Sequence, residues 1–296
     1  MGNSFSGIPD NSIVDSISAV YKLQMPDAIF EKLSAFIYRE FGIKMPPVKK
    51  VMLQSRLQRR LRELQMNSYE QYCDFVFSKE GEAMELVHMI DVVTTNKTDF
   101  FREPAHFDFM QQVVLPEFVH KNKKNPLLKI WSAGCSSGEE VYTLAIVLSE
   151  FARNQQELDF SILGTDISSA ILRKAFDAVY TESRVANIPM ELKKRYFLRS
   201  RDREKPSVRV VPELRKKTHY ARLNFMDENY DIRENFDVIF CRNVLIYFDR
   251  VTQQNVINRL CRSLKTGGYF FLGHSESITS MNVPLVQLKP TVFMKV

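Results

Sequence analysis

Cysteine is scarce in this sequence, and its spacing excludes two classes of site. The 296 residues include only four cysteines, which lie far apart and form no Cys-x-x-Cys pair. They are Cys73, Cys135, Cys241 and Cys261. We therefore expect no zinc or dithiol redox site and no metal, and a reducing, cytoplasmic location is the natural one.

Long apolar runs are also missing. None approaches the roughly 20 residues that cross a bilayer, so we expect no membrane insertion. The first 20 residues lack the basic start and apolar block of a signal peptide. Residues 1–6 match the loose N-myristoylation pattern, which we discount because it is short and falls in a predicted flexible arm, residues 1–25.

What remains is the composition of a globular protein with an excess of positive charge. The chain is 45% apolar and 26% charged, which is ordinary for globular proteins, and its length allows two domains. The formal charge of +6 predicts an acidic partner, and composition alone leaves nucleic acid and an acidic protein surface open.

Residues 127–148 combine an apolar strand, a turn of small residues and an amphipathic helix. This arrangement brings backbone close to a nucleotide-like ligand in a doubly wound sheet, and Gly134 and Gly138 permit the close approach. The spacing is not Gly-x-Gly-x-x-Gly, and Glu139 and Glu140 open the helix, which would repel a pyrophosphate but suit a cation. The pattern favours S-adenosylmethionine, with an ordinary βα turn as the alternative.

Polar residues follow the predicted strands at the edge where such sheets bind ligands. Asp166 comes directly after the strand predicted at 159–164, where it can accept hydrogen bonds from both ribose hydroxyls; the alternative is a cap for the next helix, predicted at 168–178. Gly134, Asn224 and Asn243 also lie at such ends.

The N-terminal part is predicted to be an all-helical domain, residues 26–92. Apolar residues recur at helical spacing, with helices expected over 27–41, from Pro46 onward, over 68–78 and over 82–93. The second helix has six basic and no acidic residues between Lys49 and Arg62. Exposed helices usually mix signs to gain ion pairs, so we predict a docking surface for an acidic partner, against the alternative of a solvated bundle face.

Residues 93–105 are predicted to connect this domain to the cofactor domain, residues 106–296, and to contribute to the site through their hydroxyls, an amide and an arginine. Residues 180–222 interrupt the βα alternation and predict a small antiparallel insert, with strands at 196–198 and 207–211 and a further strand at 219–225. A sheet this small is marginally stable alone, so we expect it to pack against the main domain.

Five motifs together resemble the chemotaxis receptor methyltransferases, the CheR-type protein-glutamate O-methyltransferases of bacteria. They are residues 94–102, 134–140, 164–167, 236–249 and 273–277. The resemblance runs from about residue 27 to the end. It implies a doubly wound α/β fold of the class I S-adenosylmethionine-dependent methyltransferases, with the N-terminal helical domain and the β insert. Val141 and Ser137 depart from a common proline and threonine, which are small changes.

The resemblance also implies the reaction. The donor would be S-adenosylmethionine, the product S-adenosylhomocysteine, and the acceptors glutamate side chains in the cytoplasmic domains of methyl-accepting chemotaxis receptors, giving glutamyl methyl esters for sensory adaptation. No nucleic acid is expected as a partner. In the family, the basic helix meets the receptor methylation region and the insert binds a receptor C-terminal tail in some members; whether this insert does so is open.

Motif matching assigns the residues of the site. In the family the matching residues hold the methionine amine (Glu139), the ribose (Asp166) and the adenine (Asn224 with Phe225). The full cofactor set is Asn96, Thr98, Arg102, Gly134, Glu139, Asp166, Asn224, Phe225, Asn243 and Val244. The catalytic candidates are Arg102 and Tyr247. The docking candidates are Lys49, Arg56, Arg59 and Arg60.

The expected chemistry is an in-line displacement at the sulfonium methyl. A glutamate carboxylate is ionised at neutral pH, so the site needs alignment rather than a general base, and none of the five histidines forms a triad. Arg102 would hold the acceptor carboxylate; Tyr247 would orient it, or only pack.

Two alternatives belong to other classes. A nucleic-acid methyltransferase would carry an Asn/Asp-Pro-Pro-Tyr/Phe block or a Pro-Cys nucleophile, and the corresponding position here is residues 242–245, Arg-Asn-Val-Leu. A non-catalytic S-adenosylmethionine-binding module is disfavoured by the intact Arg102 and Tyr247.

Overall fold

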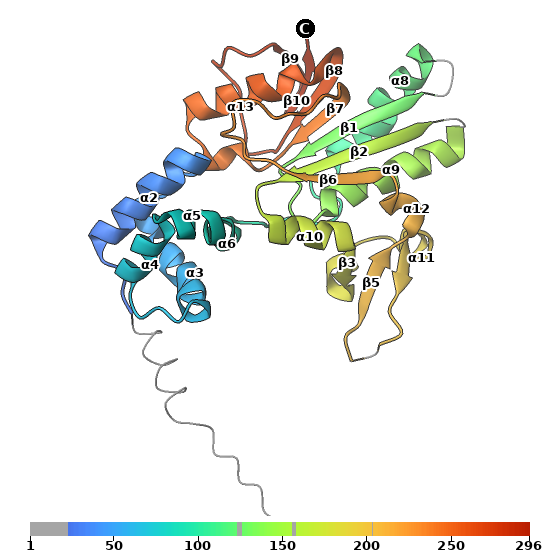
Figure 1. Cartoon of the computed structure of the whole chain (residues 1–296). Helices are drawn as coiled ribbons and strands as arrows, with labels where there is room; N and C mark the ends of the chain where they lie inside the picture. The colour runs from blue at the N-terminus through green and yellow to red at the C-terminus, as the bar shows by residue number, and fades with distance from the viewer. Residues whose placement is uncertain (1–22, 123–125, 156–157, 203) are drawn as a thin grey trace, which may run out of the picture. The chain divides into compact units, whose positions relative to one another are not determined.

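The computed structural model describes residues 23–122, 126–155, 158–202 and 204–296. The pattern at residues 1–6 and most of the arm predicted for residues 1–25 lie outside the described residues. The chain divides into two compact units, Met1–Thr94 and Thr95–Val296, called here the helical unit and the sheet unit (Figure 1). Among the helices of the described residues, none has both the length and the apolar character that a membrane crossing requires.

The helical unit packs short helices around an apolar centre. Its elements are α2 (Asp27–Phe41), η1 (Pro47–Lys49), α3 (Lys50–Glu63), α4 (Tyr69–Val76), α5 (Lys79–Met84) and α6 (Leu86–Val93). The prediction of a single helix over 82–93 is wrong, because α5 begins three residues earlier and Glu85 interrupts the helix between α5 and α6. Ser78 starts α5 by accepting a hydrogen bond from the Gly81 amide at 3.0 Å.

Glu85 turns inward at this break and forms a buried ion pair. Its carboxylate accepts bonds from Nε and Nη2 of Arg60, at 2.8 and 2.6 Å, and from the Tyr72 hydroxyl at 2.9 Å. The Glu85 side chain is 2% exposed and that of Arg60 12%. The pair therefore joins α3 to the α5–α6 junction inside the helical unit.

The sheet unit is built on one seven-stranded sheet with the order β6-β2-β1-β7-β8-β10-β9. Five strands are parallel: β6 (Thr218–Arg222), β2 (Asp159–Asp166), β1 (Leu127–Ala133), β7 (Phe236–Cys241) and β8 (Leu264–Leu272). At the far edge β10 (Val292–Lys295) runs antiparallel to β8 and to β9 (Leu285–Lys289). The strand β9 escaped prediction because its residues are almost all exposed and show no alternation.

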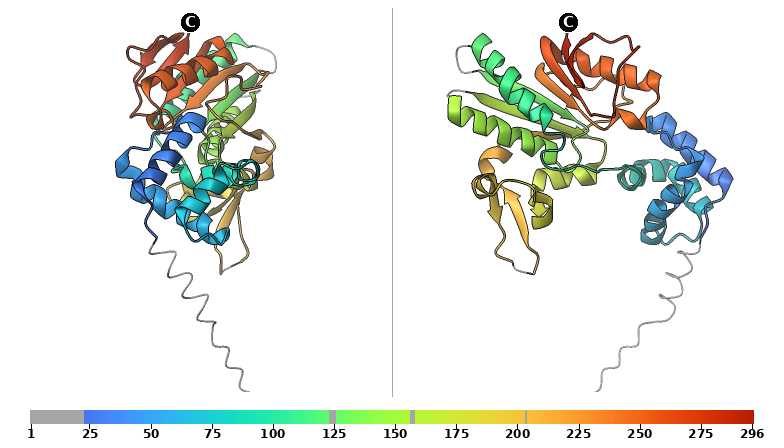
Figure 2. Two further views of the ribbon diagram at one scale, coloured as in Figure 1. Left: turned by 60° about the vertical axis from the view of Figure 1, so that its left-hand side comes forward. Right: turned by 180° about the vertical axis from the view of Figure 1, so that it is seen from behind.

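The helices cover both faces of this sheet. They are α7 (Ala105–Phe109), η2 (Met110–Val114), α8 (Leu115–Lys121), α9 (Glu139–Gln155), α10 (Ser169–Asp177) and α13 (Arg250–Arg262). Figures 1 and 2 show α8 and α13 on opposite faces. The connection from β1 to β2 runs toward one edge of the sheet, and the connection from β7 to β8 runs toward the other. Because both crossovers are right-handed, their helices lie on opposite faces. Between β1 and β7 the order therefore reverses, which is where such sheets bind ligands.

The insert is a three-stranded antiparallel sheet in the order β3-β5-β4. It comprises β3 (Val179–Thr181), η3 (Glu182–Val185), α11 (Met190–Tyr196), β4 (Phe197–Arg199), β5 (Ser207–Val210) and α12 (Pro212–Arg215).

The prediction that the strand near 219–225 belongs to the insert is wrong, because that strand is β6 and pairs in parallel with β2. Gly164 makes room for it: a Cβ there would lie 2.9 Å from the Tyr220 ring. The pattern of residues within a strand does not reveal which sheet it joins.

The Glu85 pair gives a stability prediction. Glu85→Ala leaves the buried Arg60 guanidinium without its main partner, so we expect the helical unit to lose about 3–5 kcal/mol of unfolding free energy. Glu63→Ala removes the exposed partner of the same arginine and should cost less than about 1 kcal/mol. Urea unfolding of the full chain, followed by circular dichroism, measures both, and equal losses would contradict the structure.

Candidate active site

The loop after β1 has a backbone that only small residues permit. Gly134 and Gly138 have φ of 83° and 90°, in the region that disfavours side chains. A Cβ on Gly134 would lie 2.4 Å from Val244 Cγ2. The amides of Gly134 and Cys135 both donate to the Thr165 carbonyl, at 2.7 and 2.9 Å. The loop is therefore fixed against the end of β2 and against the loop after β7.

Asp166 lies at the end of β2 and holds this loop directly. Its Oδ2 accepts a bond from the Ser136 amide at 2.9 Å and its Oδ1 from the Ser168 amide at 3.0 Å. The alternative role, a cap for α10, is wrong, because the capping side chain is Ser168, whose hydroxyl accepts from the Ile171 amide. A carboxylate has about four acceptor positions, so two backbone bonds are compatible with a ribose contact, which stays a prediction.

The predicted connector lies against the same loop. The Ser136 hydroxyl donates to the Asn96 carbonyl at 3.0 Å, and the Phe101 amide donates to the Thr143 hydroxyl on α9 at 3.0 Å. Thr98 is buried. The structure thus brings residues 96–101 and the glycine loop together, although they are some 40 residues apart in sequence.

Glu139, at the start of α9, is 1% exposed and already paired. It accepts a bond from the Ser137 hydroxyl at 2.6 Å and one from the guanidinium of Arg184, on η3 of the insert, at 2.5 Å. Arg184 also binds Asp99 Oδ1 at 3.1 Å and the Thr98 carbonyl. Arg184 therefore links the insert, the connector and the glycine loop. No motif in the sequence around Arg184 indicated this role.

Arg242, directly after β7, is the most connected side chain of the site. Its Nε donates to Glu140 at 2.7 Å, its Nη1 to His106 Nδ1 at 2.8 Å and to Glu103 at 3.4 Å, and its Nη2 to the Arg102 carbonyl at 2.9 Å. The side chain is 2% exposed. Burial acts to raise the pKa of Glu103, but the charge of Arg242 and further hydrogen bonds leave that pKa below its ordinary value.

His106 is neutral in this network. Its Nε2 donates to the Thr291 hydroxyl at 2.8 Å, since that hydroxyl itself donates to the Pro290 carbonyl, and its Nδ1 is left to accept from Arg242. Burial, and then the charge of Arg242, lowers the pKa of His106 to about 4. Glu103, His106 and His274 could hold a cation by spacing. The Arg242 guanidinium already binds Glu103 and His106 Nδ1, and its charge would repel a second cation, so we assign no metal there.

The loop after β7 is shaped by a buried carboxylate. Glu276 accepts the amides of Asn243 and Val244, both at 2.9 Å, and those of Leu245 and Gly273, both at 2.7 Å. Burial raises the pKa of Glu276 above its ordinary value in spite of these four bonds. Asn243 has a φ of 60°, and its side-chain amide donates to Glu103 at 3.3 Å. Glu276 lies in a recognised motif, but its role requires the fold.

Arg102 is half-buried, and its guanidinium donates to the Lys97 carbonyl at 3.0 Å. Within the described ranges it forms no ion pair with a carboxylate. Tyr247 ends the short helix η4 (Leu245–Tyr247) and is half-buried.

Asn224 and Phe225 follow β6. Asn224 accepts a bond from the Met226 amide at 3.0 Å, and Phe225 packs edge-on against Tyr230 and Phe248. Their predicted contact with the adenine is not tested by these contacts.

The four docking candidates differ in how they are used inside the helical unit. Arg59 is 71% exposed and pairs with Glu63, whereas Arg60 is bound to Glu85. Arg56 donates to the carbonyls of residues 93 and 94, and Lys49 Nζ donates to the Lys44 carbonyl at 3.2 Å. The basic face is thus partly used internally, and docking stays a prediction.

Comparison with known proteins gives matches along most of the chain. One family model, described as "CheR methyltransferase, SAM binding domain", matches residues 96–294, and another, "CheR methyltransferase, all-alpha domain", matches residues 28–94. A chemotaxis protein methyltransferase of Borreliella burgdorferi is 39% identical over 89% of this chain and 93% of its own length. One of Salmonella typhimurium is 32% identical over 93% of each chain.

The His106 network predicts a pH-dependent stability. The folded chain binds the proton at a pKa of about 4 and the unfolded chain near the ordinary value of about 6.5. The unfolded chain therefore holds more protons between these pH values. The contribution of neutral His106 to the free energy of unfolding is fully present above pH 6.5 and is lost as the pH falls toward 4. At pH 5 we expect a loss of about 2 kcal/mol.

Urea unfolding at pH 7 and pH 5 measures this loss. In His106→Gln, which keeps one acceptor and one donor but cannot titrate, the decline should be smaller by that amount. His219→Gln, at an exposed position, is the matched control. Identical pH dependence in the parent chain and His106→Gln would show that His106 does not titrate in this way.

Proposed function

Since the chain belongs to the CheR methyltransferase family, we propose that it methylates glutamate side chains of methyl-accepting chemotaxis receptors. Its relatives are chemotaxis protein methyltransferases, and the larger of its two family domains binds S-adenosylmethionine. The finer proposal is the acceptor: a glutamate carboxylate in the cytoplasmic domain of a receptor, converted to a γ-glutamyl methyl ester. The chain would accordingly work in the cytoplasm.

The state of Arg102 supports an acidic acceptor. Of the arginines near the cofactor loop, Arg184 is neutralised by Glu139 and Asp99, and Arg242 by Glu140 and Glu103. Arg102 has no such partner in the described part of the chain. A partly desolvated guanidinium favours a carboxylate, which it can hold by two parallel bonds. An arriving glutamate would supply that charge.

The proposed mechanism needs alignment more than proton transfer. The sulfonium of the donor supplies a methyl group that is ready for displacement, and the acceptor carboxylate is already ionised. Arg102 would hold the carboxylate, with Tyr247 orienting it. Asp166 would hold the ribose and Glu139 the methionine amine, with its charge moderated by Arg184. The neutralised network around Arg242 gives fixed dipoles that do not reorganise during the reaction.

Receptor docking is proposed for two other surfaces. Lys49, Arg56, Arg59 and Arg60 on or beside α3 would face the acidic methylation region, with Arg59 the most exposed of the arginines. The insert has edge strands β3 and β4, to which an extended receptor tail could add by backbone hydrogen bonds. Each surface is proposed for its own unit.

The substrate proposal has a direct test. The protein is incubated with methyl-labelled donor and either a receptor cytoplasmic fragment or RNA. We expect label on receptor glutamates that is released by base, as methyl esters are. Label on RNA alone would replace the proposal with a nucleic-acid methyltransferase. Donor binding without any transfer would leave a non-catalytic binding module.

The ribose role of Asp166 has a separate test. Asp166→Ala removes the acceptor for the ribose and the bonds from the Ser136 and Ser168 amides, so we expect the Kd for S-adenosylhomocysteine to rise about 100-fold, or about 3 kcal/mol. Titration calorimetry measures it. Asp177→Ala, an exposed residue ending α10, is the control and should leave the Kd unchanged. Near-normal affinity in Asp166→Ala would refute the role.

A further inference from the structure

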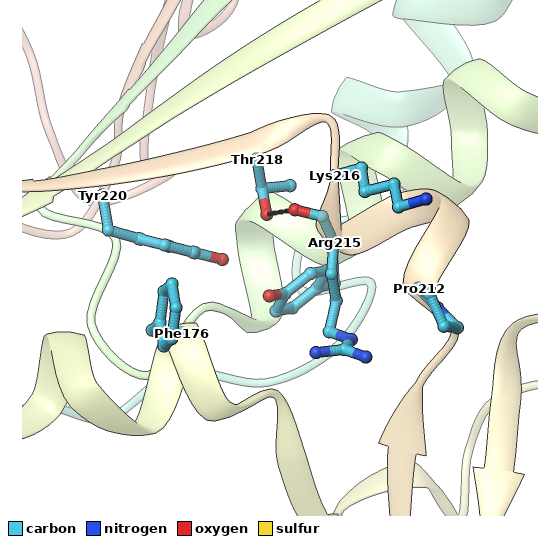
Figure 3. Close-up of a pocket in the computed structure, with 7 residues that line it drawn as sticks. Phe176, Pro212, Arg215, Lys216, Thr218 and Tyr220 are labelled. Carbon is cyan, nitrogen blue, oxygen red and sulfur yellow. Dashed lines mark hydrogen bonds between the residues drawn. The ribbon is translucent and has the colours of Figure 1, made fainter.

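A pocket of about 230 Å³ opens in the sheet unit beside β6, and none of the predicted cofactor residues lines it. Two aromatic rings lie at its walls, Phe176 from α10 and Tyr220 from β6 (Figure 3), and the buried Tyr142 of α9 also lines it. Phe176 is 62% exposed although it is large and apolar. Rings that converge on one space offer faces and edges against which a planar ligand can pack.

The same pocket carries positive charge. Arg215 and Lys216, at the end of α12, also line it. Among the described residues neither forms an ion pair, and the Arg215 side chain donates from Nε to the Val210 carbonyl, at 3.1 Å. Figure 3 shows the Arg215 guanidinium in the space between Phe176 and Pro212. A guanidinium that is not neutralised favours a carboxylate or phosphate and also stacks on planar groups.

Size and polarity limit the ligand further. The volume is below the roughly 300–1,000 Å³ of pockets for drug-sized ligands, so one or two rings would fill it. The Tyr220 hydroxyl is shielded from solvent and interacts with the Tyr142 hydroxyl, so the polar contacts of a ligand must come from the basic side chains.

We propose that this pocket binds a small planar aromatic anion, a single ring system that carries a carboxylate or a phosphate. The ring packs against Phe176 and Tyr220, and the anion faces Arg215 and Lys216. A peptide fits less well, because its backbone would bring donors and acceptors to a lining that is mostly rings and hydrocarbon. The proposal concerns a second site and does not depend on which acceptor is methylated.

Titration calorimetry on the full chain tests the proposal, with saturating S-adenosylhomocysteine present so that the cofactor site is filled. The probes 4-hydroxybenzoate and uridine monophosphate distinguish a carboxylate from a nucleotide source. Cyclohexanecarboxylate keeps the charge without the aromatic ring, and benzamide keeps the ring without the charge. We expect saturable binding of at least one aromatic anion, at least tenfold tighter than either control.

Two variants locate the site. Phe176→Leu keeps apolar volume but removes the ring, and Arg215→Gln removes the charge; each should raise the Kd about tenfold. Arg153→Gln, an exposed arginine on α9, should leave it unchanged. Lack of saturable binding, equal binding of cyclohexanecarboxylate or benzamide, or an unchanged Kd in both variants would each overturn the proposal. Binding of S-adenosylhomocysteine, measured first, reports separately on the cofactor site.

Discussion

One buried guanidinium joins the parts of the site. Arg242 contacts Glu140 on α9, Glu103 and the Arg102 carbonyl in the connector, and His106 on α7. A charge removed from water is tolerated only when several partners compensate it together. The connector, the helix after the glycine loop and the loop after β7 must therefore be in place at once. This arrangement fixes the backbone of Arg102, because the Arg102 carbonyl accepts a hydrogen bond from Arg242.

The sheet supplies the frame on which this network rests. The strand order reverses between β1 and β7, and the loops that follow them touch, with Val244 filling the space over Gly134. The backbone amides that follow β7 and β8 lie beyond the ends of these strands. Glu276 accepts hydrogen bonds from four of these amides. Irregular backbone at the ligand edge is thus held by carboxylates, Asp166 on one side and Glu276 on the other, because helices and strands have ended there.

The regular elements were largely predictable from the sequence, because local periodicity and capping determine them. The strand, glycine turn and helix over 127–155, and Ser68 as the cap of α4, are local features. The place of β6 was not predictable, since Gly164 and Tyr220 fit together only across strands. Glu85 broke a predicted helix for the same reason: its partner, Arg60, is 25 residues away.

In the candidate site, too, local motifs were predictable and contacts between distant segments were not. Motifs indicated which residue types lie at the strand ends, and the structure gathers the connector, the glycine loop and Asp166 in one place. The ion pairs of Arg184 with Glu139, and of Arg242 with Glu140 and Glu103, were not predicted, because an ion pair between distant segments leaves no spacing to recognise. Composition also does not show that Arg60, one of the docking candidates on the basic helix, is bound to an internal carboxylate.

Arg184 has a consequence for how such chains can be recombined. It belongs to the insert, yet it is the counter-ion of Glu139, which is 1% exposed, and it also holds Asp99 and the Thr98 carbonyl. A chimera that exchanges the insert for a foreign one would leave a buried negative charge uncompensated at the start of α9. The insert is therefore not an independent module: a transplant must carry the arginine together with both of its acidic partners.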